Sequence, residues 1–163
     1  MERDPIDEIL DQWSEERPDL DTASLGVVIR VMTLYRSFRR QADRALEPLD
    51  LELWEYDVLS ALRRQGSPFQ LPATALARTV SLSSGAMTNR IDKLETKAFV
   101  ERNPDPGDRR GVNVKLTRKG RSAIDKAIRG RLNAANDCIS SLTGPERKTL
   151  ASLLRKVALS SVD

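Results

Sequence analysis

The chain has 163 residues, with 27 Lys and Arg, 24 Asp and Glu, and no histidine. Without histidine it lacks the usual general base and the commonest metal ligand, which disfavours most enzyme classes and predicts a protein with no catalytic residue, metal or cofactor. A single cysteine cannot form an intramolecular disulfide or a multi-cysteine zinc site, and no run of about 18 apolar residues occurs, so we expect a cytoplasmic protein.

The charge is divided unevenly along the chain. Residues 1–21 carry nine acids and two bases, a net charge of −7, which leaves +10 for the rest because the total is +3. A basic body of this kind indicates a polyanionic partner. A solvated surface of mixed charge is the alternative.

Helical patterns occupy the first third of the chain. Asp4-Pro5 has the pattern of an N-cap followed by a proline in the first turn, and the apolar spacing that follows predicts a short amphipathic helix ending before Pro18. A second apolar series, from Val28 to Ala45, predicts a long helix that stops near Pro48. A third helix is predicted over 51–65, closed by Gly66.

The segment from 72 to 117 has the pattern of a winged helix-turn-helix. A short helix over 74–80, a polar connection over 81–83 and a helix over 84–94 are followed by a strand over 99–102, a turn-rich tip over 103–111 and a return strand over 112–117. A long helix from 118 to 142 and a last helix after Gly144-Pro145 complete the chain. We therefore predict a mainly α fold with a small β wing.

The second helix of this motif has an outward face suited to a DNA groove. If Met87, Ile91 and Leu94 are buried, small and polar residues point outward. Serines at the helix start suit a phosphate oxygen, and the amide and hydroxyl groups that follow can bond base edges. The predicted DNA contacts, two of them on the wing, are Ser83, Ser84, Ala86, Thr88, Asn89, Arg90, Lys93, Arg109 and Arg110. An ordinary surface helix with a serine cap is the alternative.

The wing is basic. Residues 97–121 contain eight bases and three acids, and Arg109 or Arg110 at its tip can enter a narrow, electronegative minor groove. Asp108 is expected to shape the tip and orient an arginine rather than to meet DNA. The alternative is a solvated hairpin.

Two motifs in this region resemble a known family. Asp-Pro-x-Asp-Arg-Arg at 105–110 and Leu-Thr-x-x-Gly at 116–120, after two leading helices and the helix-turn-helix, are similar to the multiple antibiotic resistance regulator (MarR) family over roughly 25–160. The resemblance implies a homodimer that binds double-stranded DNA. It also implies an extra amphipathic helix at 1–20, dimerisation helices at 21–48 and 118–163, and a DNA-binding lobe at 49–117.

A narrower resemblance concerns a ligand. The extra helix with Trp13, and Asp57, Arg90 and Arg102 at matching places, resemble the urate-responsive regulators of this family, which include the hypothetical uricase regulator and the pectinase regulator. The resemblance implies that these four residues form a ligand site between the dimer region and the DNA-binding lobe. An indole suits a planar heterocycle and arginines suit a negatively charged ligand. A bound anion would compete for Arg90 and repel Asp57.

Other roles remain for all four residues. Trp13 can dock the extra helix, Asp57 and Arg90 can form a structural ion pair, and Arg102 can contact phosphate. We therefore predict a repressor released from a pseudo-palindromic operator by a small anionic aromatic such as urate or a related purine. The first alternative is a constitutive or architectural DNA-binding protein without an effector, and the second, less favoured, is an enzyme.

Overall fold

The computed structural model describes the backbone of residues 2–105 and 108–160, and the side chains of the same residues except 108–110. The chain divides into two compact units, Met1–Gln41 and Ala42–Asp163, and each is described by itself. No helix in the described ranges is long and apolar enough to cross a membrane.

The first unit contains α1 (Pro5–Glu16) and most of α2 (Ala23–Leu46). The predicted N-cap of α1 is confirmed, because an Asp4 carboxylate oxygen accepts from the backbone N–H groups of Ile6 at 2.9 Å and Asp7 at 3.1 Å. The Asp7 carboxylate accepts in return from the Asp4 backbone N–H at 2.9 Å, which completes a capping box. The helix therefore begins where the sequence predicts.

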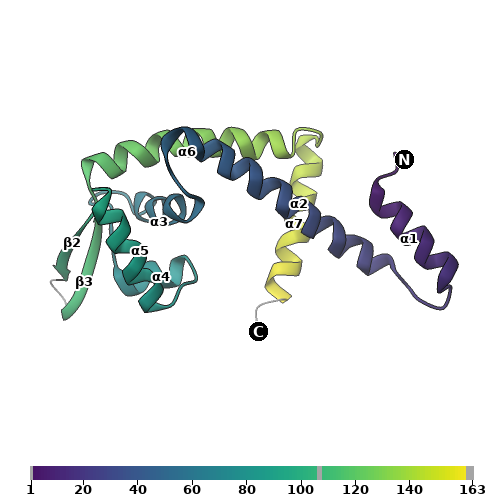
Figure 1. Ribbon diagram of the computed structural model, residues 1–163, viewed down its shortest axis with the longest axis horizontal. Coiled ribbons are helices and arrows are strands. Elements are labelled where there is room, and N and C mark those ends of the chain that lie inside the picture. Colours follow the sequence, from purple (N-terminus) through teal and green to yellow (C-terminus); the bar gives the residue numbers. More distant parts are fainter. Residues whose placement is uncertain (1, 106–107, 161–163) are drawn as a thin grey trace. The chain divides into compact units, whose positions relative to one another are not determined.

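The second unit is a winged helix-turn-helix followed by two helices, and the predicted mainly α fold with a small β wing is confirmed (Figure 1). Its three strands form one antiparallel sheet in the order β1-β3-β2. The elements after α2 are η1 (Glu47–Leu49), α3 (Leu53–Arg63), β1 (Gln70–Pro72), α4 (Ala73–Thr79), α5 (Ser84–Thr96), β2 (Val100–Asp105), β3 (Asp108–Leu116), α6 (Arg118–Cys138) and α7 (Gly144–Ser160).

One hydrophobic core joins α3, α4, α5, the sheet and α6. The face of α5 that the spacing predicts to be buried is buried, because Met87, Ile91 and Leu94 are at most 2% exposed. They belong to the same cluster as Val58 and Leu62 of α3, with further members from α4, β3 and α6. Since the inward face of α5 is fixed by this packing, its opposite face is presented to solvent in a defined orientation.

The wing differs from its prediction in length. The turn-rich tip expected over 103–111 is too long, because β2 continues to Asp105 and β3 begins at Asp108, with Asn103 opposite Asn113 and Pro104 opposite Val112. Pro104 is tolerated because β2 is an edge strand, where a missing N–H breaks no central ladder. The helix expected to reach 142 ends at Cys138.

The Leu-Thr-x-x-Gly motif anchors α6 to the base of the wing. The hydroxyl of Thr117 accepts from the Gly120 backbone N–H at 3.0 Å and donates to the Ala98 carbonyl at 2.8 Å. Gly120 lies directly against the backbone carbonyl of Phe99, where any Cβ would overlap that oxygen. The motif therefore supplies an N-cap and the one residue small enough for this approach.

Candidate nucleic-acid interface

The outward face of α5 has the composition and exposure that the sequence predicts. Ser83 is the N-cap, its hydroxyl accepting from the Ala86 N–H at 3.3 Å. Thr88 donates its hydroxyl proton to the Ser84 carbonyl at 3.0 Å, so its oxygen can still accept from an external donor. The exposed predicted contacts on this helix and its cap are Ser83, Ser84, Ala86, Thr88, Asn89 and Lys93.

Arg90 is half-buried and leans toward α3. Its guanidinium carbon lies 5.2 Å from the centroid of the Trp54 ring, and the Lys93 ammonium lies 5.9 Å from the same ring. The indole N–H of Trp54 donates to a Glu52 carboxylate oxygen at 2.9 Å, which fixes the ring. Two cations beside one aromatic ring define a positive edge along α5. Sequence reasoning missed this aromatic partner of Arg90.

Arg102 joins the wing to α5, the second helix of the helix-turn-helix, which is called the recognition helix below. Its guanidinium forms an ion pair with Asp92 at 2.6 Å and a second one with Glu95, and its backbone N–H donates to the other Glu95 oxygen at 3.0 Å. A longer bond at 3.4 Å reaches the carbonyl of Thr88. One side chain of β2 therefore grips α5 from Thr88 to Glu95. Sequence reasoning missed both carboxylates, although their spacing of three residues places them on one face of a helix.

A further ion pair holds the C-terminal end of the recognition helix. Lys97 lies 3.0 Å from a carboxylate oxygen of Glu55, which is only 1% exposed, and donates to the Asp50 carbonyl at 3.1 Å. Burial alone would lower the pKa of Lys97, but the hydrogen bond to Glu55 and the negative charges of Glu55, Asp50 and Glu52 together raise the pKa above its ordinary value. The helix is therefore positioned by α3 at one end and by the wing along its length.

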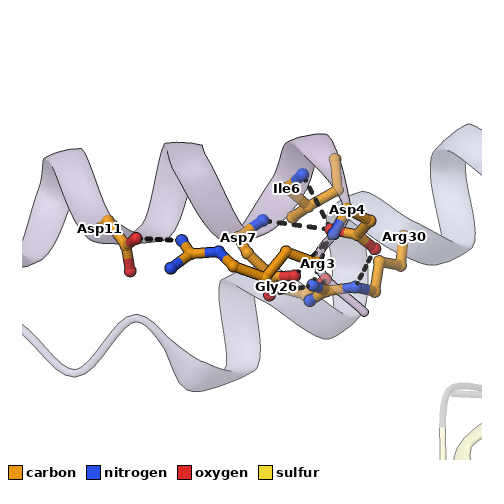
Figure 2. Close-up of polar contacts among 7 residues, drawn as sticks. All are labelled: Arg3, Asp4, Ile6, Asp7, Asp11, Gly26 and Arg30. Carbon is orange, nitrogen blue, oxygen red and sulfur yellow. Dashed lines mark hydrogen bonds and ion pairs between the residues drawn. The ribbon is translucent and has the colours of Figure 1, made fainter. Parts of the chain in front are cut away.

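In the first unit, α1 is docked on α2 through Arg30 (Figure 2). The guanidinium reaches both Asp4 oxygens, at 2.8 and 2.9 Å, and one Asp7 oxygen at 2.6 Å. The hydrogen bond from Arg30 holds the pKa of Asp4 below its ordinary value. Gly26 allows the approach, because a Cβ there would come within 2.7 Å of the Leu10 side chain. This docking positions α1, and with it Trp13, which is 44% exposed.

The four predicted ligand residues are divided between the units. Trp13 belongs to the first unit, whereas Asp57, Arg90 and Arg102 belong to the second. Asp57 lines a hollow of about 260 Å³ with Ser60, Arg64 and residues 79–81, so Arg90 and Arg102 lie outside its wall. The side chains of the wing residues Asp108, Arg109 and Arg110 lie outside the described residues.

Known proteins similar to this chain share its winged helix-turn-helix. The model of the MarR family matches residues 51–112. The chain is 30% identical to the HTH-type transcriptional regulator PecS from Dickeya dadantii (strain 3937), over 93% of this chain and 92% of PecS. The chain belongs to the MarR family. MarR-family membership makes it a DNA-binding transcriptional regulator and not an enzyme.

Solved MarR-family structures agree with the fold. A mutant MarR from E. coli complexed with operator DNA is 30% identical, with a TM-score of 0.72 over 89% of this chain and 96% of that one. AbsC from Streptomyces coelicolor has a TM-score of 0.79 over 86% and 95% of the two chains, and at 20% identity it supports the fold alone. The relative whose operator complex is known therefore covers 89% of this chain.

Proposed function

We propose that this MarR-family protein acts as a homodimeric repressor in the cytoplasm. It binds a pseudo-palindromic operator and leaves it when a small anionic aromatic, urate or a related purine, binds. The observation that carries the DNA half of the proposal is the face of α5 described above. This face is exposed, capped by Ser83 and held to the wing by Arg102. A rigid reading helix with small and polar residues outward is what the major groove admits.

Each side chain on this surface has a separate role in the proposal. The hydroxyls of Ser83 and Ser84, at the start of α5, meet a phosphate. Thr88 and Asn89 bond base edges, with Ala86 allowing close approach. Arg90 and Lys93 contact the DNA backbone beside the groove, and Arg109 and Arg110 on the wing enter the neighbouring minor groove.

Dimerisation is supported by apolar side chains that a single chain leaves exposed. On α2 they are Val27, Val28, Val31, Met32 and Tyr35, and on α7 they are Leu150, Leu153, Leu154 and Val157. Rows of exposed apolar residues along two helices are typical of surfaces that a second protein covers. In a symmetric dimer, two copies of α5 would face half-sites about 34 Å apart, one turn of DNA.

The ligand half rests on Trp13, Asp57, Arg90 and Arg102. Arg102 already binds two carboxylates, so an anionic ligand would have to compete with Asp92 and Glu95 for its guanidinium. Losing that grip would free the wing from the recognition helix, and an anion near Arg90 would pull that arginine from the Trp54 ring. Either change disturbs the reading surface, which gives the ligand a physical route to release DNA.

The two ion pairs of Arg102 also support the alternative function, a DNA-binding protein without an effector. If the two ion pairs are permanent, Arg102 is a structural residue and the protein binds DNA constitutively, without an effector. The two functions share the DNA-binding surface and differ only in whether a small molecule changes DNA affinity.

The DNA-binding surface is tested by replacing Arg109 and Arg110 with alanine. Each lost phosphate or minor-groove contact should weaken binding to a random-sequence duplex and lower the slope of log affinity against log salt by about 1. Fluorescence anisotropy at several salt concentrations measures both quantities. The matched control removes Lys148 and Arg155, exposed residues of α7, with the same change in charge. Equal affinities for the two variants would show that the wing does not contact DNA.

A further inference from the structure

A basic hollow lies at the base of the wing, apart from the recognition helix. Its volume is about 880 Å³, and its wall comes from the loop before β1, the end of β3 and the first three turns of α6. The residues that determine its chemistry are Phe69, Lys115, Arg118, Arg121, Lys126 and Arg129. No lining residue belongs to α4 or α5, so the proposed DNA-reading helix does not account for this concentration of charge.

Most of the cations in the hollow have no ion-pair partner among the residues that the structure describes. Arg118, Arg121, Lys126 and Arg129 form no ion pair with another described residue, whereas Lys115 lies 3.4 Å from Glu101. The single acid of the wall, Asp125, is already paired with Arg63 at 2.6 Å. Four like charges around one concavity repel one another and raise the local positive potential. An anion bound among them would relieve that repulsion.

An aromatic ring holds part of this wall in place. The guanidinium carbons of Arg63 and Arg121 lie 5.0 and 5.1 Å from the centroid of Phe69. Phe69 has a φ of 61°, a left-handed conformation that is uncommon for a bulky residue, and its carbonyl accepts from the Leu116 N–H at 3.0 Å. Arg121 is therefore partly ordered before any ligand arrives, which lowers the entropic cost of binding.

The size and place of the hollow favour a small ligand over a DNA duplex. Its volume falls within the roughly 300–1,000 Å³ that is usual for small-molecule sites. Lys115 is seven residues along β3 from Asp108, at the opposite end of the strand from the wing tip. At about 3.3 Å per residue this separation is about 23 Å. A DNA duplex held at the wing tip would therefore reach the hollow only if the duplex curved toward α6.

We propose that this hollow binds a small molecule carrying two or more phosphate groups. The cations come from two elements, with Lys115 on β3 and the other four along one face of α6, so two phosphates can be held at once. Arginine provides forked donors to phosphate oxygens and lysine a mobile point charge. The site is independent of the proposed purine site, since none of Trp13, Asp57, Arg90 and Arg102 lines it.

The test measures the binding of inorganic tripolyphosphate to the full chain by titration calorimetry at about 50 mM salt, where phosphate contacts are strong. The test variant is Lys126→Gln with Arg129→Gln, two exposed residues of the hollow. The control is Lys148→Gln with Arg155→Gln, which removes one lysine and one arginine from α7. By helical spacing these two lie on the side opposite Leu150 and Leu154.

The test variant should bind tripolyphosphate at least about tenfold more weakly than the control, which should match the natural chain. Arg118→Gln alone should weaken binding in the same direction, which covers the case in which the double variant is poorly folded. Absence of binding to the natural chain, or equal loss in test and control variants, would overturn the proposal. So would a loss of duplex affinity with unchanged tripolyphosphate affinity, which would make the hollow a DNA contact. The response to urate does not enter these measurements, so the proposed function is tested separately.

Discussion

Ser83 and Arg102 illustrate how single residues prepare the reading surface. Ser83 satisfies a backbone N–H of the first turn of α5, and Arg102 ties the same helix to β2 through Asp92 and Glu95. In the proposed function, both residues keep the side chains that contact bases in one orientation, which lowers the entropy lost when DNA binds.

Replacing Ser83 separates its two roles. Ser83→Ala removes the cap and should lower the free energy of unfolding by about 1 kcal/mol. Ser83→Asp keeps a capping oxygen, so stability in urea should stay near that of the natural chain, but the added negative charge should repel DNA phosphate. Urea denaturation and duplex anisotropy measure the two effects. Natural DNA affinity for Ser83→Asp would mean that no phosphate lies near this cap.

At the scale of elements, the sequence predicts best where a pattern is local. Apolar spacing identifies the buried face of α5, and the Asp4-Pro5 pair identifies the start of α1. Both patterns can be read from neighbouring residues of a single helix. The three-residue strand β1 was missed because it exists only by pairing with β3. The tip was predicted too long because Asn103 and Pro104 are typical turn residues that here occupy an edge strand.

In the candidate site, too, the sequence predicts local features but not contacts between elements. The exposed face of α5 follows from spacing, but Trp54 under Arg90 and the carboxylates on Arg102 depend on packing between elements. Nothing in a linear sequence states which helix faces which strand. The family resemblance gives the four ligand positions but not the side chains that contact Arg90 and Arg102.

Gly120 tests the joint between α6 and the wing. Gly120→Ala would place a methyl group on the Phe99 carbonyl and should destabilise the fold by about 2–3 kcal/mol or more. Gly85→Ala is the matched control, because nothing lies within 4 Å of a Cβ there and alanine favours a helix by roughly 0.5–1 kcal/mol. Thermal and urea unfolding compare the two. Equal stabilities would show that the backbone at the base of the wing can shift to accept the methyl group at little cost in free energy.

At the scale of the whole molecule, the exposed faces of α2 and α7 predict that function requires two chains. Leu154→Asp places a charge in the apolar row of α7 and should shift the protein toward monomers in sedimentation equilibrium, with weaker operator binding because one half-site is lost. Ser152→Asp, on the opposite side of the same helix, should leave both unchanged. A Leu154→Asp variant that still sediments as the natural chain does would exclude α7 from the dimer interface.

The charge distribution also acts on the whole molecule. The acidic segment 1–21 lowers the net charge of a body that carries +10, and its helix α1 is fastened to α2 by Arg30. We expect this segment to limit nonspecific attraction to DNA while it positions Trp13. Regulation would then involve the same helix that moderates DNA affinity.

The most direct test of the account is the affinity for DNA with and without urate. The probe is the duplex that the protein selects from a random-sequence pool, and fluorescence anisotropy measures its dissociation constant. Urate should weaken binding by about tenfold or more. The Trp13→Phe variant should keep the affinity for DNA but lose most of the response to urate. An affinity that neither urate, xanthine nor another purine changes would contradict the account and leave a constitutive DNA-binding protein.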